Sequence, residues 1–198
     1  MDELEISIRK KLKKKLDADR YEHTLGVSYT AACLAMRYGA DMKKAALAGL
    51  LHDCAKCIPD SEKILKCRKH NIPVTEIERK NPSLLHAKLG AYYAKSKYGV
   101  EDKEILSAIA CHTTGKENMS LLEEILFIAD YIEPDRDKAP DLAEIRSLAF
   151  QDLQLAVAKV LLGTIQYVNK RNAAMDETTQ RAYQYYSNLI TIRNQANS

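Results

Sequence analysis

The chain has 198 residues, of which 46% are hydrophobic and 29% charged, and its formal net charge is +3. That length can bury a hydrophobic core, and the charge is too small to indicate nucleic-acid binding by itself. No apolar run reaches the roughly 18 residues of a membrane span, and the acidic N-terminus lacks the apolar stretch of a secretory signal. We therefore expect a cytoplasmic protein without a membrane anchor.

The first half of the chain predicts a series of helices. The first covers about residues 2–18, where apolar side chains recur every fourth residue, and the second covers about 20–38 and ends at Gly39. Asp41 is the predicted N-cap of a third helix, about 42–56. Pro59 ends that segment, and Asp60 or Ser61 is expected to cap a short helix through about Arg68.

The second half continues in the same way. Pro82 suits the first turn of a helix, and Pro134 and Pro140 bracket a loop. Alternating β-branched runs are absent, so we predict an all-α, single-domain bundle over residues 1–198, with a metal-binding core of about 18–136. The remaining helices are predicted near 75–80, 82–98, 101–112, 120–132, 141–170 (with a break considered near 150) and 176–192, and the last two ranges form the C-terminal part of about 141–192.

Cysteines and basic residues give weaker signals. The five cysteines are scattered and odd in number, which argues against a disulfide framework. Cys54 and Cys57 form a CxxC, as in redox and zinc sites, but no second CxxC completes a zinc site, and we interpret both thiols as structural. The basic run 9–15 is interpreted as the solvated face of the first helix, with attraction of an anionic substrate or RNA as the alternative.

Four of the five histidines belong to one series with two aspartates. Each member lies on the inward stripe of its predicted helix. A single histidine on an apolar face is usually a core residue, but four on four helices are harder to explain in that way. Buried carboxylates are costly unless they are paired or bound to a cation. The series predicts a metal centre, against the alternative of unrelated polar core residues, and its order H-x28-HD-x32-H-x25-H-x17-D comprises His23, His52, Asp53, His86, His112 and Asp130.

The predicted ligands suffice for two divalent ions. Neighbouring helix residues point about 100° apart, so His52 and Asp53 reach one centre only if the end of their helix faces it. A donor set of imidazole and carboxylate without thiolate suits iron, manganese or cobalt. The positive charge of two divalent ions exceeds the negative charge of two aspartates, which favours an anionic substrate such as a phosphate ester. We assign His23, His52, Asp53 and Asp130 to the first ion, and Asp53, His86 and His112 to the second.

Five segments around these residues carry a resemblance to a known family. The order H…HD…H…H…D resembles the HD-domain metal-dependent phosphohydrolases, and the two additional histidines resemble their dinuclear branch. Over about residues 18–192 the chain looks like the bacterial YqeK family of symmetrical bis(5′-nucleosyl)-tetraphosphatases. The resemblance implies an HD-type bundle, a di-iron centre on the same six ligands and cleavage of diadenosine tetraphosphate into two ADP. The matching segments are 20–27, 48–56, 85–90, 109–115 and 128–136.

Cations near the predicted ligands are candidates for phosphate contacts. Arg20, Lys56 and Arg136 each lie within a few residues of a ligand, although each could also lie on a solvated face. We assign catalytic roles to Asp53 and Lys56. Lys170 and Arg171, in the connection 169–175 between the last two helices, are candidates for closing over the nucleoside. His70 lies outside the series in a basic segment, and we expect it to be exposed.

Two other functions fit the same residues. One is a different HD enzyme, a nucleotidase or phosphodiesterase with the same centre and another pocket. The other is a non-catalytic nucleotide- or RNA-binding module, which the complete ligand series disfavours. We expect a small-molecule dinucleoside polyphosphate as the partner rather than nucleic acid. Tyr183, Tyr185 and Tyr186 could fill the core, form a homodimer surface or stack on a base, and we favour the first two.

Overall fold

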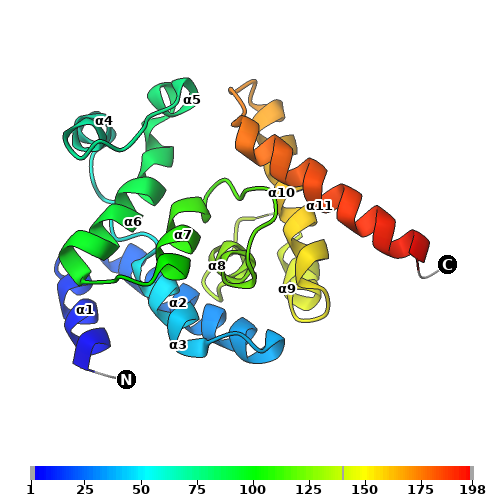
Figure 1. Cartoon of the computed structure of the whole chain (residues 1–198), viewed down its shortest axis with the longest axis horizontal. Helices are drawn as coiled ribbons and strands as arrows, with labels where there is room; N and C mark the ends of the chain where they lie inside the picture. The colour runs from blue at the N-terminus through cyan, green and yellow to red at the C-terminus, as the bar shows by residue number, and fades with distance from the viewer. Residues whose placement is uncertain (1–2, 140, 197–198) are drawn as a thin grey trace.

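The structure is a computed structural model that describes residues 3–139 and 141–196. Those residues form eleven α-helices, one 3₁₀-helix and no strand, which confirms the all-α prediction (Figure 1). Within the described part, every helix is too short or too polar to cross a membrane. The elements are α1 (Glu3–Lys13), α2 (Ala18–Tyr38), α3 (Met42–Leu51), α4 (Asp60–Lys69), α5 (Glu76–Lys80), η1 (Pro82–Leu84), α6 (Leu85–Tyr98), α7 (Lys103–Cys111), α8 (Leu121–Ile132), α9 (Leu142–Ala149), α10 (Leu153–Lys170) and α11 (Glu177–Ala196).

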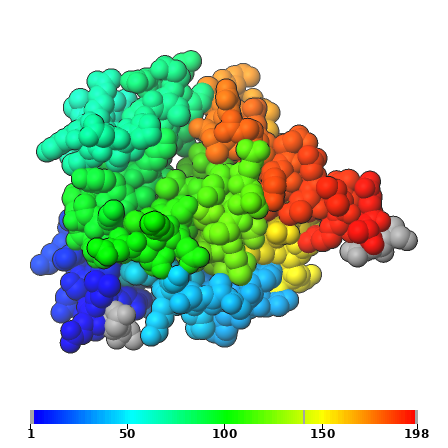
Figure 2. Space-filling model, in the orientation of Figure 1, coloured from blue at the N-terminus to red at the C-terminus, as the bar shows by residue number. Residues whose placement is uncertain are grey.

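Helix α8 runs through the middle of the bundle, where it packs against α2, α3, α7 and α10 (Figure 1). Its apolar residues are almost all buried in the core. The helices α2 and α3 lie very close together, because a Cβ atom at Gly49 would lie only 2.7 Å from Cα of Ser28. Figure 2 shows the end of α11 projecting from the body of the molecule.

Two predicted helices end earlier than the sequence indicated. Helix α1 ends at Lys13, because Asp17 caps the start of α2 through a 2.8 Å bond from the backbone N–H of Arg20. Helix α3 ends at Leu51 rather than near residue 56, and residues 52–58 form tight turns with bonds from Cys54 N–H to Leu51 (3.1 Å) and onward. These turns change the direction of the chain just at the His-Asp pair.

Most other predicted boundaries agree with the structure to within two residues. Gly39 ends α2 as predicted, and Gly99 follows the predicted end of α6 at residue 98; both adopt the left-handed conformation with a φ of 73°. The predicted cap at Asp60 or Ser61 is wrong: Pro59 occupies the N-cap position, no side chain caps α4, and Asp60 instead pairs with Lys63. Pro82 begins a 3₁₀ turn rather than the α-helix itself.

The C-terminal helices follow the sequence pattern closely. The break considered near residue 150 is present, because α9 ends at Ala149 and Asp152 caps α10. Tyr186 is 1% exposed and its hydroxyl donates a 2.8 Å hydrogen bond to Glu124, so this tyrosine belongs to the core. Tyr183 and Tyr185 are partly buried against the same core.

Candidate metal centre

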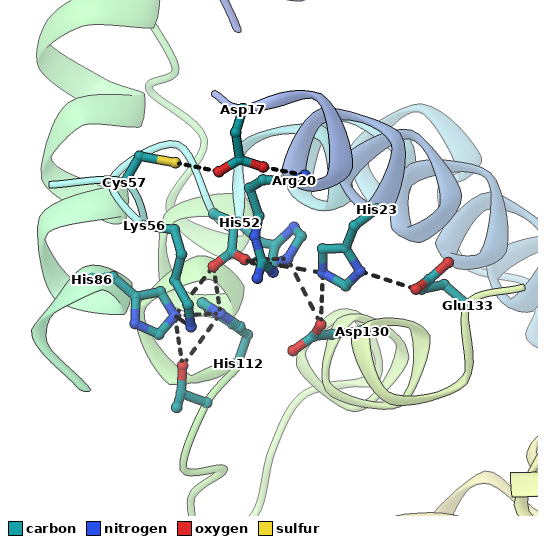
Figure 3. Close-up of polar contacts among 12 residues, drawn as sticks. Asp17, Arg20, His23, His52, Lys56, Cys57, His86, His112, Asp130 and Glu133 are labelled. Carbon is teal, nitrogen blue, oxygen red and sulfur yellow. Dashed lines mark hydrogen bonds and ion pairs between the residues drawn. The ribbon is translucent and has the colours of Figure 1, made fainter. Parts of the chain in front are cut away.

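Six side chains from five parts of the chain converge beside the end of α3 (Figure 3). His23 comes from the second turn of α2, His86 from the start of α6 and Asp130 from the last turn of α8. His52 and His112 are the C-cap residues of α3 and α7. Because α3 ends at His52 and the chain turns there, Asp53 reaches the same centre as its neighbour.

Asp53 lies between two pairs of imidazoles. Its Oδ1 is 3.2 Å from Nε2 of His86 and 3.7 Å from Nε2 of His112. Its Oδ2 is 3.5 Å from Nε2 of His52 and 3.9 Å from Nε2 of His23. Each oxygen of this one carboxylate therefore faces a different half of the cluster, which is the arrangement of a carboxylate that can serve two cations.

Three of the four imidazole rings are held by the same kind of hydrogen bond. Nδ1 of His52, His86 and His112 lies 2.7, 2.5 and 2.8 Å from the backbone carbonyl three residues earlier in the chain. Carbonyl oxygens only accept hydrogen bonds, so Nδ1 donates in each ring and the lone pair is on Nε2. All of these Nε2 atoms point into the cluster, as neutral imidazole ligands of a metal require.

His23 is oriented by a side chain instead. Its Nδ1 donates to Oε1 of Glu133 at 3.0 Å, and Glu133 is 2% exposed. Oε2 of the same carboxylate accepts the backbone N–H of Asp135 at 2.8 Å. Gly26 leaves the room that Glu133 needs, because a Cβ atom there would lie 2.6 Å from Oε2. The pairing of a ligand-type histidine with a buried carboxylate is common beside protein-bound metals.

Burial and neighbouring charges shift several pKa values in the cluster. Burial, reinforced by the nearby His112, lowers the pKa of His86 to about 4, against the opposing effect of Asp53. Burial opposes ionisation of Asp53, but the adjoining histidines hold the pKa of this carboxyl well below its ordinary value. The same balance, with His23 as the main partner, lowers the pKa of Asp130. Near neutral pH both carboxyls are ionised and His86 is neutral, the states in which such side chains bind metals.

The donor set fits a divalent metal. Nε2 of His23, Nε2 of His52 and Oδ1 of Asp53 are buried and lack a hydrogen-bond partner of good geometry among the described residues. Buried polar atoms without such a partner are rare in proteins and often mark the place of a cation. Two groups of three residues each have donor atoms that lie within 4.8 Å of one another. The first group is His23, His52 and Asp130, and the second is His52, Asp53 and His112.

Three of the five predicted substrate cations contact this cluster. Nη1 of Arg20 lies 2.8 Å from Oδ2 of Asp53, and Nη2 of Arg136 lies 2.8 Å from Oδ1 of Asp130. Nζ of Lys56 lies 3.3 Å from Nε2 of His86 (Figure 3). Lys170 and Arg171 are exposed, and in the described part of the chain neither forms an ion pair or hydrogen bond with the cluster. The guanidinium of Arg171 instead lies 4.5 Å from the ring centroid of Tyr167.

The cluster lies between two pockets. The larger one, of 630 Å³, is lined by His23, Arg20, Arg136 and several carboxylates of α2 and the loop after α8. The smaller one, of 110 Å³, is lined by His112 and Asp130. Arg136 and Ala139 line both pockets, so the loop after α8 forms a common rim. A ligand that bridges the pockets would pass directly over the cluster.

The structure also shows what the sequence interpretation missed. Glu133 follows Asp130 in the Tyr-Ile-Glu-Pro segment, and a glutamate directly after an apolar helix was the available signal. Oγ1 of Thr113 lies 3.2 Å from Nε2 of both His86 and His112, and only its position next to a predicted ligand pointed to it. The expected exposure of His70 was wrong, because its ring is half-buried and stacks on Tyr92 with the centroids 4.2 Å apart.

Comparison with known proteins agrees with this fold. The HD domain model matches residues 20–135. "Bis(5′-nucleosyl)-tetraphosphatase, symmetrical" of Halalkalibacterium halodurans is 42% identical over 87% of the chain and 91% of that protein. The protein of the same name in Bacillus subtilis is 40% identical over 88% of the chain and 92% of that protein.

A solved structure is similar over nearly the whole chain. It is that of a predicted HD superfamily hydrolase involved in NAD metabolism from Clostridium acetobutylicum, with a TM-score of 0.89 and 39% sequence identity. The alignment covers 92% of this chain and 96% of the other. The chain therefore belongs to the HD-domain family and, within it, to the family of the symmetrical bis(5′-nucleosyl)-tetraphosphatases.

Proposed function

We propose that the protein is a metal-dependent hydrolase that cleaves diadenosine tetraphosphate symmetrically into two ADP. The observation that carries this proposal is the convergence of four imidazole Nε2 atoms on Asp53, in a chain whose relatives bear the name of that activity. A cluster of nitrogen and oxygen donors between two pockets suits hydrolysis of a long polyphosphate better than recognition of a nucleic acid.

The proposed ligands are the six residues of the cluster. His23, His52, Asp53 and Asp130 would hold one ion, and Asp53, His86 and His112 would hold the other. His52 belongs to both groups of residues whose donor atoms lie within 4.8 Å of one another, so it could also bind the second ion. Because no thiolate contributes, we propose iron, with manganese or cobalt as alternatives. When bound, such ions lower the pKa of water and offset the negative charge of phosphate oxygens.

The chain's own residues would position the substrate. Arg20 and Arg136 reach the cluster from the side of the larger pocket, and Lys56 reaches it beside His86. We propose that these three cations bind the phosphates and that Lys56 stabilises charge on the phosphoryl group under attack. The carboxylates that also line the larger pocket would repel phosphate, so the phosphates are expected beside the two arginines and the nucleoside farther out.

Symmetry of cleavage requires that one half of the substrate has a fixed position. The two pockets share a rim at Arg136 and Ala139, and this rim can fix the position of the substrate. A nucleoside diphosphate in one pocket would leave the other half of the substrate on the far side of the cluster. We propose that Lys170 and Arg171 add long-range attraction, since the structure gives them no contact with the cluster. ADP is already a fair leaving group, so a strong general acid is not needed.

Product analysis tests this function directly. Protein purified without added metal is analysed for bound metal and incubated with diadenosine tetraphosphate, and the nucleotides are separated by chromatography. Two ADP per substrate are expected, with no ATP or AMP. Asp53→Asn should lose both metal and turnover while its helical circular dichroism is retained. ATP plus AMP as products, or full turnover of the Asp53→Asn variant, would contradict the proposal.

A further inference from the structure

A third pocket, of 270 Å³, lies between the end of α1, the turns after α3, and helices α4 and α6. None of the six cluster residues lines it. The turns at residues 52–58 separate this pocket from the candidate metal centre. Asp53 and Lys56 contact the centre, whereas Cys54 and Cys57 line this third pocket. Figure 3 shows the side chains of Cys57 and Lys56 diverging from neighbouring positions of this segment.

Lysines from three separate elements meet at this pocket. Lys15 follows α1, Lys66 belongs to α4 and Lys97 to α6. Lys66 pairs with Glu62 at 3.1 Å, and Glu62 is the one carboxylate among the described residues that line the pocket. Lys15 and Lys97 have no carboxylate within ion-pair distance in the described part of the chain. Partial burial and the repulsion of Lys15 and Lys66 lower the pKa of Lys97, as expected where ammonium groups converge without counter-charge.

Two tyrosine rings form part of the pocket wall. Tyr93 is 6% and Tyr98 4% exposed, and both line the pocket. Nζ of Lys97 lies 3.3 Å from the ring centroid of Tyr93, and Nζ of Lys15 lies 5.7 Å from that of Tyr98, so the tyrosines hold both ammonium groups at the pocket wall.

The buried thiol of the pocket does not oppose an anion. Burial raises the pKa of the Cys54 thiol to about 12, so Cys54 is uncharged near neutral pH. The lining therefore carries three ammonium groups against one carboxylate. Lysine ammonium groups are common phosphate binders, and a volume of 270 Å³ is below the usual range for a whole nucleotide.

We propose that this pocket is a separate binding site for a small phosphate-bearing anion, held by the ammonium groups of Lys15 and Lys97. The ligand is either free pyrophosphate or phosphate, or the terminal phosphates of a nucleotide whose nucleoside remains outside. Bound there, the anion would rest against the reverse side of the turns that carry Asp53 and Lys56, within contact of the chain segment that shapes the catalytic centre.

Cysteine alkylation tests the site without relying on enzyme activity. Cys57 is exposed and lines the pocket, whereas Cys33 is exposed on α2 outside it and serves as an internal control. The full-length protein with its metal is treated with iodoacetamide, with and without pyrophosphate at constant ionic strength, and labelling is followed by peptide mass spectrometry. At a pyrophosphate concentration about ten times Kd, labelling of Cys57 should slow about tenfold, because only the free protein reacts. Labelling of Cys33 should not change.

A matched pair of double variants separates this pocket from the metal centre. Lys15→Gln with Lys97→Gln removes the two unpaired ammonium groups, and Lys13→Gln with Lys95→Gln removes the same charge from exposed lysines nearby that do not line the pocket. The first double variant should lose the protection of Cys57 by pyrophosphate, and the second should keep it. Because each variant is compared with and without anion, an altered basal reactivity of the thiol does not affect the result.

A second arm identifies the source of the phosphate. ADP is tested in the same way at equal concentration. Protection by pyrophosphate alone supports a free anion as the ligand, and protection by both supports the terminal phosphates of a nucleotide. Equal protection in the two double variants would place the effect elsewhere and overturn the proposal, as would unchanged labelling of Cys57 with pyrophosphate, phosphate and ADP. Either result leaves the proposed hydrolase untouched, since that function rests on the metal centre.

Discussion

The cations next to the metal centre and those at the far end of α10 belong to two differently organised regions. Arg20, Lys56 and Arg136 lie 2.8 to 3.3 Å from cluster atoms, on segments whose positions are set by the core. Lys170 and Arg171 lie exposed at the end of α10, where the guanidinium of Arg171 is 4.5 Å from the ring centroid of Tyr167. From this difference we expect that a basic residue strengthens phosphate binding more, the more rigidly the fold holds it against the charged centre.

The largest effect is expected from a cluster histidine. His52→Asn removes a buried donor, and bound metal ions supply several kcal/mol of transition-state stabilisation, so kcat/KM should fall about a thousandfold or more. The metal content, measured by atomic emission, should fall with it. His70→Asn is the matched control, because His70 stacks on Tyr92 outside the centre, and its activity should remain within about twofold. Similar losses of kcat/KM in both variants would mean that His52 matters no more for activity than a half-buried histidine outside the centre.

The next effect tests whether the orientation of His23 matters. Glu133→Gln keeps the size of the side chain but removes the charge that fixes Nδ1–H of His23. Loss of such a partner lowers metal affinity about 10- to 100-fold. Metal titration monitored by competition with a chelating dye measures this change, and kcat at saturating metal should recover. Glu117→Gln, at an exposed glutamate paired with Arg181, is the control. An unchanged metal affinity in Glu133→Gln would remove the proposed role of that residue.

A smaller effect is expected for the phosphate contacts. Arg136→Gln should raise KM for diadenosine tetraphosphate about tenfold or more, because a charge-assisted hydrogen bond contributes roughly 1.5–3 kcal/mol. Metal content should stay unchanged, which separates this variant from His52→Asn. Arg136→Lys should recover only part of the loss, since lysine cannot reproduce the planar fork of arginine. A normal KM for Arg136→Gln would show that the phosphates bind elsewhere.

The smallest effect is expected from the other region. Lys170→Gln combined with Arg171→Gln should raise KM by about twofold or less at physiological salt, because charges beyond a Debye length of about 8 Å are largely screened. The effect should grow at low ionic strength, as long-range attraction predicts. A tenfold rise that does not depend on salt would mean that the connection between α10 and α11 closes over the substrate, and the contrast between the two regions would then disappear.

The sequence predicted the helices well where local signals were strong. Gly39 and Gly99 mark helix ends because glycine tolerates the left-handed conformation there, with a φ of 73° at both positions. Asp41 caps α3 as predicted, with its carboxylate accepting the backbone N–H groups of Lys43 and Lys44. The end of α3 was missed, because no glycine or proline follows Leu51 until Pro59, and only packing of the following turns against the centre decides where the helix stops.

The spacing of four histidines and two aspartates along the chain was enough to select the candidate ligands and the family, because each inward position follows from helix periodicity, a local property. Only the tertiary structure decided that Oδ1 and Oδ2 of Asp53 face different histidine pairs, that Glu133 fills the space left by Gly26, and that three lysines meet around Tyr98. Those relations join residues that are distant in sequence. They depend on how the helices pack against one another, and no local pattern in the chain encodes that packing.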